Sequence, residues 1–415
     1  MIRATRTQWI KFAVVLALYL IFLVWLRSWL GLVVVPFIFD AYITKKIPWT
    51  WWRESKNRHV VTVMGWVDAI VFALVAVYFV NLYFFQNYVI PSSSLEKSLL
   101  TGDYLFVSKM SYGPRVPQTP LHMPLAQHTL PFFNCKSYLE HPQWDYKRVK
   151  GLGDVQLNDI VVFNFPAGDT VATGVPNDDI YRLSYGAGKE LAKPVDLASM
   201  TPEQQRVVYD YYYQLGREYL KENPQNFGEI ISRPVDRREN YVKRCVGLPG
   251  QTLEIKDRII YLDGKANKEP DNVQYRYLVK TKRPIPDDLA HELGISKEDM
   301  MMYYTDASVY NMPLTEKAKA GLLARKDIVV SIENTPADDA GGLYPLNMYK
   351  NWTTDNYGPV WIPKKGETVK LTIENLPVYE RPIHVYEGNE LVVKDGKIYI
   401  NGKETDEYTF KMDYY

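Results

Sequence analysis

Three long apolar runs near the N-terminus constrain this chain more than any other feature, because such segments must be buried in lipid or in a protein core. The runs cover residues 12–26, 29–39 and 69–80, and none of them contains a charged residue. With their flanks, the first and third reach the ~20 residues that span a bilayer. The second is shorter, contains Pro36 and ends at Asp40, so a span, a re-entrant turn and an interfacial helix all fit it.

The loop between the second and third runs predicts how the chain is oriented in a membrane. Its sequence, KKIPWTWWRESKNRH, carries five Lys and Arg residues against one acid. The positive-inside rule places this loop in the cytoplasm, and its tryptophans suit the interface. The third run then leads outward, so everything after about Gln86 is expected outside the cytoplasm, whichever side the N-terminus occupies. No small-residue cleavage site follows the first run, which argues against a cleavable signal peptide.

Charge and cysteine content exclude several classes of protein. The chain has 49 basic and 48 acidic residues, a net charge of +1, so no strong field attracts nucleic acid. Its two cysteines, Cys135 and Cys245, are too few for a disulfide framework and lack metal-ligand spacing. A single bridge between them could form in an oxidising compartment, but two buried free thiols are the favoured expectation.

From residue 100 onward, short alternating runs separated by Gly, Pro and Asp predict antiparallel strands joined by tight turns. Two segments echo each other, TLEIKDRIIYLDGK at 252–265 and ELVVKDGKIYINGK at 390–403. Both place a turn dipeptide before a lysine, Asp263-Gly264 in one and Asn401-Gly402 in the other. Each segment is therefore predicted to form a β-hairpin.

One helix is predicted from about Thr201 to Leu220. Thr201 is suited to the N-cap, Pro202 to the first helical position, and Gln204 completes a capping box. The helix carries four tyrosines that are interpreted as packing against the β-core rather than as a ligand surface: Tyr209, Tyr211, Tyr212 and Tyr213.

A serine-rich segment follows the third apolar run, and its pattern is more informative than its serines alone. The sequence IPSSSLEKSLLTGDYLFVSKMSYG resembles the motif of type I signal peptidases, in which Ile-Pro-Ser-x-Ser precedes a hydrophobic residue and a Gly-Asp turn. The resemblance implies that Ser94 is the nucleophile and that Ser92 donates its hydroxyl to the oxyanion. Gly102 and Asp103 match the turn.

A second segment, YVKRCVGLPG at 241–250, resembles the lysine box of the same family. The match implies that Lys243 is the general base and Arg244 its structural neighbour, with Gly247, Pro249 and Gly250 forming the turn. NDIVVFNFP at 158–166 resembles the strand that precedes this box, although a long insertion containing the predicted helix separates the two here. Anchor, serine box and lysine box occurring in this order are specific, whereas either box alone is weak.

The chemistry that the two boxes imply is plausible for these residue types. A serine hydroxyl needs a base to become nucleophilic, and none of the six histidines lies in either box. A lysine serves only when neutral, which requires its pKa to fall by ~3 units, about 4 kcal/mol. Desolvation produces such shifts, and Val242, Cys245 and Val246 provide apolar flanks. Arg244 alternates to the other face of the strand, so its charge is expected to point away.

The resemblance also implies a substrate and the surfaces that select it. The oxyanion donors are the Ser94 backbone N–H and the Ser92 hydroxyl. The family alignment implies shallow apolar pockets that admit small side chains, although the same residues could equally belong to the core: Tyr88, Ile90, Leu95, Leu99 and Val242. The expected partners are the lipid bilayer and secreted preproteins cut after an Ala-x-Ala-like site. No metal or organic cofactor is implied, and the expected location is the plasma (inner) membrane, multi-pass, with the catalytic domain outside.

These inferences give an expected fold of N-terminal transmembrane helices followed by a mostly antiparallel β catalytic domain with an α-helical insertion. The expected divisions are a membrane anchor at 1–88, a catalytic domain at 89–265 with its insertion at about 167–238, a β-rich subdomain at 266–389, and a return hairpin at 390–415.

The chain departs from the family pattern at two places. Leu95-Glu96-Lys97 replaces the usual Met-x-Pro, and the Gly-Asp-Asn-Arg box that helps orient the base is absent from all 415 residues. The expectation is therefore a truncated sequence or a paralogue without that strand. The corresponding alternative function is a membrane-tethered binding or scaffolding protein of the same fold, without efficient catalysis.

One enzymatic rival involves Lys97. Ser94-Leu95-Glu96-Lys97 fits S-x-x-K, the signature of penicillin-binding proteins and class A β-lactamases. Those families also have K-T-G and S-D-N elements, and neither occurs in this sequence. A motif as short as S-x-x-K arises easily by chance, so Lys243 is preferred as the base.

Overall fold

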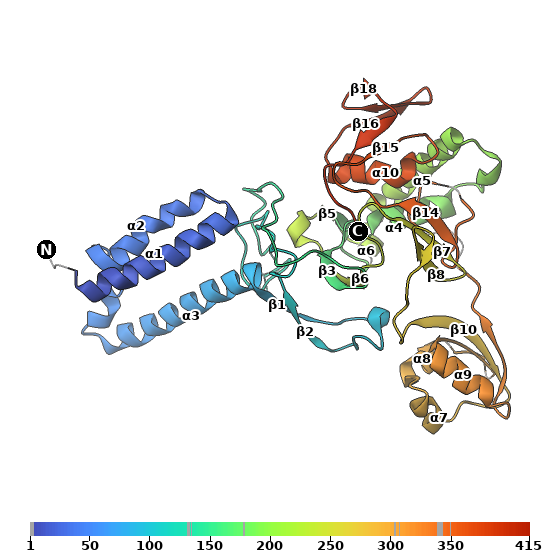
Figure 1. Ribbon diagram of the computed structural model, residues 1–415, viewed down its shortest axis with the longest axis horizontal. Coiled ribbons are helices and arrows are strands. Elements are labelled where there is room, and N and C mark those ends of the chain that lie inside the picture. The colour runs from blue at the N-terminus through green and yellow to red at the C-terminus, as the bar shows by residue number, and fades with distance from the viewer. Residues whose placement is uncertain are drawn as a thin grey trace.

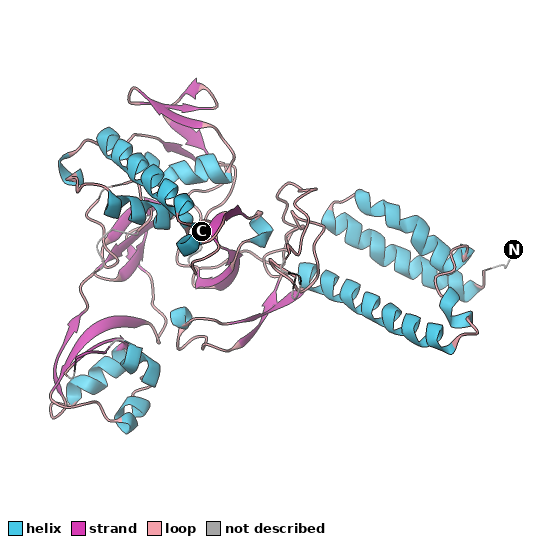
Figure 2. Ribbon diagram, turned by 180° about the vertical axis from the view of Figure 1, so that it is seen from behind, coloured by secondary structure: helices cyan, strands magenta, loops and turns pink. Residues whose placement is uncertain are grey.

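The computed structural model describes residues 4–130, 133, 135–176, 179–302, 304–306, 308–337, 343–348 and 350–415 (Figure 1). Helices alone form the N-terminal end of an elongated molecule, and the strands lie in the remainder (Figure 2). Every strand pairing within the described residues is antiparallel, which confirms the predicted β class.

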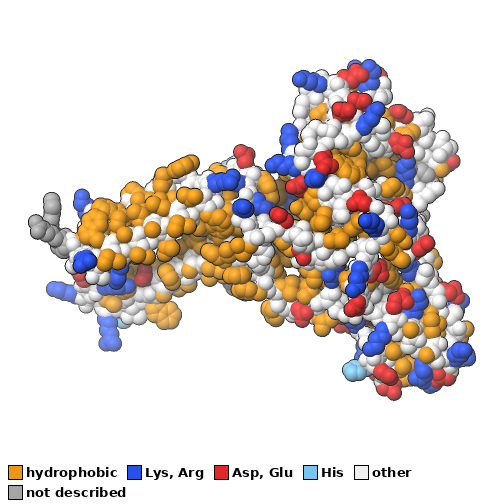
Figure 3. Space-filling model, in the orientation of Figure 1, with side chains coloured by type: hydrophobic (Ala, Val, Ile, Leu, Met, Phe, Trp, Pro, Cys, Tyr) orange, Lys and Arg blue, Asp and Glu red, His pale blue; other side chains and the backbone are white. Residues whose placement is uncertain are grey.

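The N-terminal end consists of α1 (Arg6–Leu26), α3 (Arg58–Tyr83) and a shorter helical stretch, Leu30–Thr44, that includes α2 (Val35–Phe39). By length and composition, α1 and α3 are the two described helices that could cross a membrane. Their apolar side chains cover this end of the surface (Figure 3). Whether the stretch between them spans as well stays a prediction.

The helical end is attached to the rest of the molecule at two places. The chain passes directly from α3 into β1 (Phe85–Val89), which pairs with β2 (Tyr104–Ser108). At the end of α1, Trp25 Nε1 donates to Lys150 O, and Lys147 Nζ donates to Arg27 O. Val149 also packs with Leu26 of α1 and Tyr83 of α3, so the loop around residues 147–150 lies against the ends of both apolar helices.

Two further strand pairs lie beyond this junction. β3 (Ile160–Asn164) pairs with β6 (Asn240–Arg244), and β4 (Thr170–Ala172) pairs with β5 (Ile230–Ser232). The segment between β4 and β5 holds three helices: α4 (Ile180–Leu191), α5 (Pro202–Glu222) and α6 (Pro224–Phe227).

Helix α5 confirms the predicted start signals, but its tyrosines have a different partner from the one expected. Thr201 accepts from Gln204 N and closes the capping box. Tyr209 and Tyr212 are buried against Tyr185 of α4, not against a sheet, while Tyr211 is exposed. The helices approach closely where Gly188 meets Gly216, because a Cβ on Gly216 would lie 1.8 Å from Ser184 O.

Both echoing segments form the predicted hairpins, each extended by a short third strand. The first comprises β7 (Thr252–Lys256), β8 (Ile259–Leu262) and β9 (Lys265–Ala266); the second comprises β16 (Leu391–Lys394), β17 (Lys397–Ile400) and β18 (Lys403–Glu404). Asp263-Gly264 and Asn401-Gly402 both have positive φ at each residue, the backbone of a type I′ turn.

The segment between these hairpins contains a separate sheet with its own core. The strand order is β11-β12-β10-β13, and three helices accompany it. The elements are β10 (Gln274–Thr281), β11 (Tyr304–Asp306), β12 (Val309–Thr315), β13 (Val329–Asn334), α7 (Asp287–Glu292), α8 (Lys297–Met302) and α9 (Glu316–Ala324). We call residues 274–334 the satellite subdomain, because it projects from the rest in Figure 1.

The last part of the chain returns to the first hairpin. β14 (Tyr357–Trp361) pairs with β7, and β15 (Thr368–Lys370) pairs with β19 (Glu407–Thr409). Helix α10 (Leu376–Arg381) packs in a core with Phe410 and Ile383. Both cysteines are free as expected, but Cys135 is exposed rather than buried, because it lies in a surface loop; Cys245 is buried.

Candidate active site

The serine segment is held by the turn that follows it. Ile90 N donates to Asp103 O and Gly102 N donates to Ile90 O, so the chain leaves β1 and returns to β2 at one place. Gly102 has φ +92°, which favours glycine, and Asp103 Oδ2 accepts from Leu100 N. Between these anchors, Ser93–Leu95 form a single 3-10 turn in which Ser94 is exposed.

The lysine segment approaches this turn from another sheet. Lys243 lies on β6 opposite Val161 of β3. Although 149 residues separate them in sequence, Lys243 Nζ lies 2.7 Å from Ser94 Oγ. Ser92 Oγ lies 3.5 Å from the same Ser94 Oγ, at the outer limit of a hydrogen bond. The structure thus brings together the three side chains that the two boxes singled out.

Burial lowers the pKa of Lys243 below its usual value, and it is the one cause of the shift. Lys243 is nevertheless exposed on the open surface, so its desolvation is partial rather than the enclosed pocket that the apolar flanks suggested. Among the described residues, no carboxylate lies within ion-pair distance of its amine, and no charged group is among the causes of the pKa shift.

The guanidinium of Arg244 is held at the far end of the serine segment. Its Nη2 donates to Ser98 Oγ, four residues beyond Ser94, while Nη1 donates to Asn158 O. The β-strand alternation still separates it from Lys243, since its charge is not among the causes of the lysine's pKa shift. Arg244 therefore ties β6 to the segment that carries the serine.

The glycine turn after the lysine packs on β14. A Cβ on Gly247 would lie 2.3 Å from Ile362 Cδ1. Gly250 has φ +87°, its N–H donates to Ile362 O, and its carbonyl accepts from Trp361 Nε1. With Pro249 between them, these residues end β6 and fix its position.

The five residues expected to line a substrate pocket are not gathered in one cavity. Tyr88 lines a cavity of about 950 Å³ beside β1, and burial raises its pKa to about 12. Ile90 is 3% exposed and belongs to the interior. Leu95, Leu99 and Val242 are half-buried and do not line that cavity.

Lys97, the base of the S-x-x-K alternative, forms an ion pair with Glu96 instead of a hydrogen bond with Ser94. Its Nζ pairs with Glu96 at 3.9 Å, and its backbone has φ +68°. Ser94 Oγ is approached by Lys243 instead.

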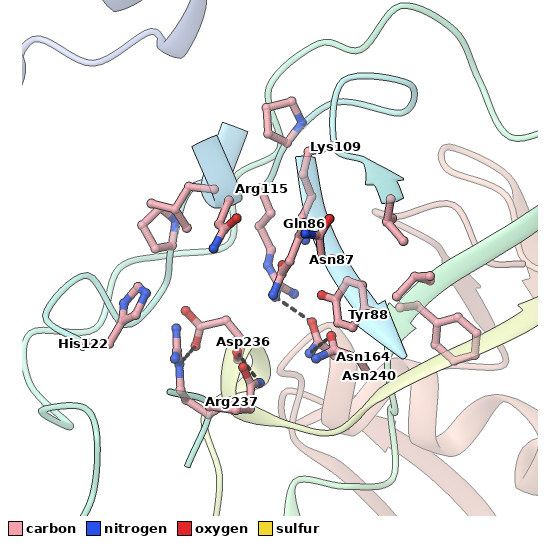
Figure 4. A pocket seen from close by; sticks show the side chains of 18 of the residues that line it. Gln86, Asn87, Tyr88, Lys109, Arg115, His122, Asn164, Asp236, Arg237 and Asn240 are labelled. Carbon is pink, nitrogen blue, oxygen red and sulfur yellow. Dashed lines mark hydrogen bonds and ion pairs between the residues drawn. The ribbon is translucent and has the colours of Figure 1, made fainter. Parts of the chain in front are cut away.

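The large cavity holds polar residues that the sequence did not single out. Arg115 Nη2 donates to Asn164 Oδ1, whose amide donates to Asn240 Oδ1, and Lys109 lines the same space (Figure 4). Lys109 follows an alternating strand in FVSKMSYG, a pattern typical of a solvated lysine. No local signal marks it, because its neighbours come from distant loops.

Comparison with known proteins identifies similar sequences. The family model described as Signal peptidase, peptidase S26, matches residues 63–303. Signal peptidase I P of Bacillus subtilis subsp. natto is 20% identical over 279 residues, 66% of this chain and 90% of that protein. Signal peptidase I of Helicobacter pylori is 42% identical over 56 residues, and that of Bacillus amyloliquefaciens is 30% identical over 93. These two matches span 14% and 22% of this chain but only 18% and 47% of the relatives. No solved structure matches significantly.

Proposed function

The chain belongs to the signal peptidase family, peptidase S26, and from that premise we propose that it is a membrane-bound serine endopeptidase that removes signal peptides from secreted preproteins. In this proposal Ser94 is the nucleophile and Lys243 the general base. The single observation that carries it is the 2.7 Å contact between Lys243 Nζ and Ser94 Oγ. The alternative of a non-catalytic scaffold is not favoured by the comparisons.

The proposed reaction begins with a proton transfer. The neutral amine of Lys243 accepts the Ser94 hydroxyl proton while Oγ attacks the carbonyl carbon of the scissile peptide bond. The new ammonium then gives its proton to the leaving amine, and an acyl-enzyme remains. The amine next takes a proton from water, whose oxygen attacks the ester and releases Ser94 with its proton restored. The negative oxygen formed in each step is stabilised by the Ser94 backbone N–H and the Ser92 hydroxyl.

Substrate binding completes the environment of the base. Lys243 is exposed in the free chain, and a peptide laid across it removes water from its amine. That desolvation lowers the pKa further, in the direction that burial already moves it. Arg244, held by Ser98 and Asn158, keeps the lysine strand in register with the serine turn.

An extended peptide has a place to bind. β1 and β6 belong to separate two-stranded sheets, so each has one edge unpaired among the described strands. A substrate segment that adds to these edges forms main-chain hydrogen bonds, and its alternate side chains then face the protein.

The proposed membrane arrangement uses α1 and α3 as spans. The basic loop before α3 stays in the cytoplasm, and α3 carries the chain outward into β1. The serine turn begins a few residues beyond the end of α3, which holds the site close to the outer surface, where preproteins emerge with their signal peptides still in the bilayer.

Cleavage of a preprotein by the full chain in detergent micelles or vesicles tests the proposal. We expect the product to end after a small residue at an Ala-x-Ala-like site, and Ser94→Ala to abolish cleavage. Ser93→Ala is the matched control, because Ser93 is a neighbouring exposed serine that lies outside the proposed dyad. Cleavage that survives Ser94→Ala, or that is lost equally in both variants, contradicts the assignment.

A further inference from the structure

We propose that the cavity beside β1 binds the phosphate of an anionic phospholipid headgroup at the outer membrane surface. Its volume is about 950 Å³, at the upper end of the range of ligand sites. Four cationic side chains line it, Lys109, Arg115, Arg148 and Arg237, and Figure 4 shows Lys109 and Arg115 side by side in it. The proposal rests on the placement of α3 in the bilayer.

Three of the four cations, Lys109, Arg115 and Arg148, have no carboxylate within ion-pair distance among the described residues. Lys109 Nζ has no hydrogen bond or ion pair among the described residues, and it lies 5.9 Å from the centre of the Tyr88 ring. Burial, together with the charges of Arg115 and Arg148, lowers the pKa of Lys109 to about 8. A buried amine surrounded by like charges is stabilised by an arriving anion.

Arg115 and Arg148 are held by neutral groups rather than by carboxylates. Arg115 donates to Asn164 Oδ1, and Arg148 donates to the Tyr146 hydroxyl and the Gly113 carbonyl. Arg237 is 5% exposed, and its Nε has no hydrogen-bond partner in the described structure. The positive charges of Arg115 and Arg148 are therefore held in place by groups that do not neutralise them.

The two acids that line the cavity are already engaged. Both oxygens of Asp236 accept from Thr119, one from its N–H and one from its hydroxyl. Asp236 also lies 3.8 Å from Arg237 Nε, so it offsets that one charge only in part. Glu239 pairs with Arg233 and His128. The cavity thus keeps an excess of positive charge.

The position of the cavity favours a lipid over a peptide carboxylate. Part of its wall is the last turns of α3, through Val77, Tyr78, Asn81 and Leu82. This is the level at which the apolar helix ends and where phosphate groups of the outer leaflet lie. Arginine and lysine at such a level bind phosphate by charge-assisted hydrogen bonds.

Native mass spectrometry of the full chain in non-ionic detergent tests the site with phosphatidylglycerol and with phosphatidylcholine of the same acyl chains. We expect phosphatidylglycerol to bind more tightly. Lys109→Met should weaken its binding about fivefold, the effect of one interfacial charge, and Lys109→Arg should retain it. Lys319→Met is the matched control, because Lys319 also lies over a tyrosine ring, that of Tyr277 in the satellite subdomain.

Each other outcome overturns the proposal. Equal binding of the two lipids, or equal loss of phosphatidylglycerol binding in Lys109→Met and Lys319→Met, shows that the cavity does not distinguish the two headgroups. Displacement by inorganic phosphate at the same concentration assigns a free-anion site, and displacement by an acidic peptide alone assigns the cavity to substrate. Ser94→Ala should bind phosphatidylglycerol as the unaltered chain does, so failure of the lipid site and failure of the protease proposal are distinguishable.

Discussion

The environment of one amine sets the behaviour of the proposed dyad. Lys243 Nζ contacts Ser94 Oγ, and among the described residues no acid holds a proton on it. Burial alone lowers its pKa. A protonated amine cannot accept the serine proton, so the active fraction of the enzyme grows as this group loses its charge.

This gives a pH dependence with a definite sign. We expect kcat/KM for a preprotein peptide to rise with pH through the pKa of Lys243, with a midpoint below the ordinary lysine value, because burial disfavours the charged form. Activity is then lost as pH falls below that midpoint. Initial rates between about pH 6 and pH 10 measure it. A flat profile, or a midpoint at or above the value of a solvated lysine, contradicts the assignment of Lys243 as base.

The two lysines near the serine should differ sharply. Lys243→Met keeps the apolar stem but removes the base, and we expect cleavage to fall by roughly 10²–10⁴-fold. Lys97→Met removes only the pairing with Glu96 at 3.9 Å, and we expect rates to stay within about threefold. Rates of preprotein cleavage for the two variants decide between them. Loss of preprotein cleavage in Lys97→Met but not in Lys243→Met would refute the proposed mechanism and favour the S-x-x-K alternative.

At the residue scale, the sequence reveals residues that belong to a local motif, but it does not reveal contacts made by segments that are distant along the chain. Two motifs pointed to Ser94 and Lys243, and the structure places their side chains in contact. Strand alternation separates the charge of Arg244 from Lys243, but it does not reveal that Ser98 accepts a hydrogen bond from Arg244, because the serine segment comes from a distant part of the chain. Lys109 was missed for the same reason, since the groups that enclose it come from elsewhere in the chain.

At the scale of elements, local sequence signals predicted individual helices and hairpins correctly, but they did not predict which elements pack together. The capping box of α5 and the turn dipeptides at 263–264 and 401–402 depend on a few adjacent residues, and the structure has the helix and both hairpins. The packing of Tyr209 and Tyr212 on α4 was not predicted. It depends on the close approach at Gly188 and Gly216, which no periodicity reveals.

That close approach can be tested with two identical substitutions. Gly216→Ala places a Cβ 1.8 Å from the Ser184 carbonyl oxygen, so we expect the helix pair to lose about 1–3 kcal/mol of stability through overpacking. Gly186→Ala, in α4, meets nothing within 4 Å and should be neutral or stabilising by up to ~1 kcal/mol. The stability effects of both substitutions are measured by the protease resistance of the 180–222 segment under increasing urea. Equal effects would show that the glycines are not the contact point.

At the scale of the whole molecule, the composition of the chain predicted its main segments better than it predicted how those segments pair in space. The apolar runs correspond to an end of the molecule whose described residues, up to the start of β1, form helices and loops (Figure 2). The satellite subdomain was outlined only as a β-rich region, because its helices α7 and α8 are six residues each and leave little periodicity to read. The pairing of β14 with β7 joins segments about a hundred residues apart, and the sequence offers no signal for it.

The proposed orientation in the membrane makes the chain's own cysteine a reporter. α3 has 26 residues, about 39 Å of helix, which suffices to cross the hydrocarbon core. Cys135 is exposed and lies beyond α3, whereas Cys245 is buried. We expect a membrane-impermeant maleimide to label intact cells at Cys135, and Cys135→Ser to abolish labelling.

The opposite side is probed by Glu54→Cys in the Cys135→Ser background, because Glu54 is exposed in the basic loop and its removal leaves the positive charges that hold the loop inside. This cysteine should react only after the membrane is permeabilised. Labelling of Glu54→Cys in intact cells, together with no labelling of Cys135 in the otherwise unaltered chain, would place the serine and the lysine in the cytoplasm. An enzyme there would meet preproteins from the wrong face of the bilayer, and the proposed function would fail together with the proposed topology.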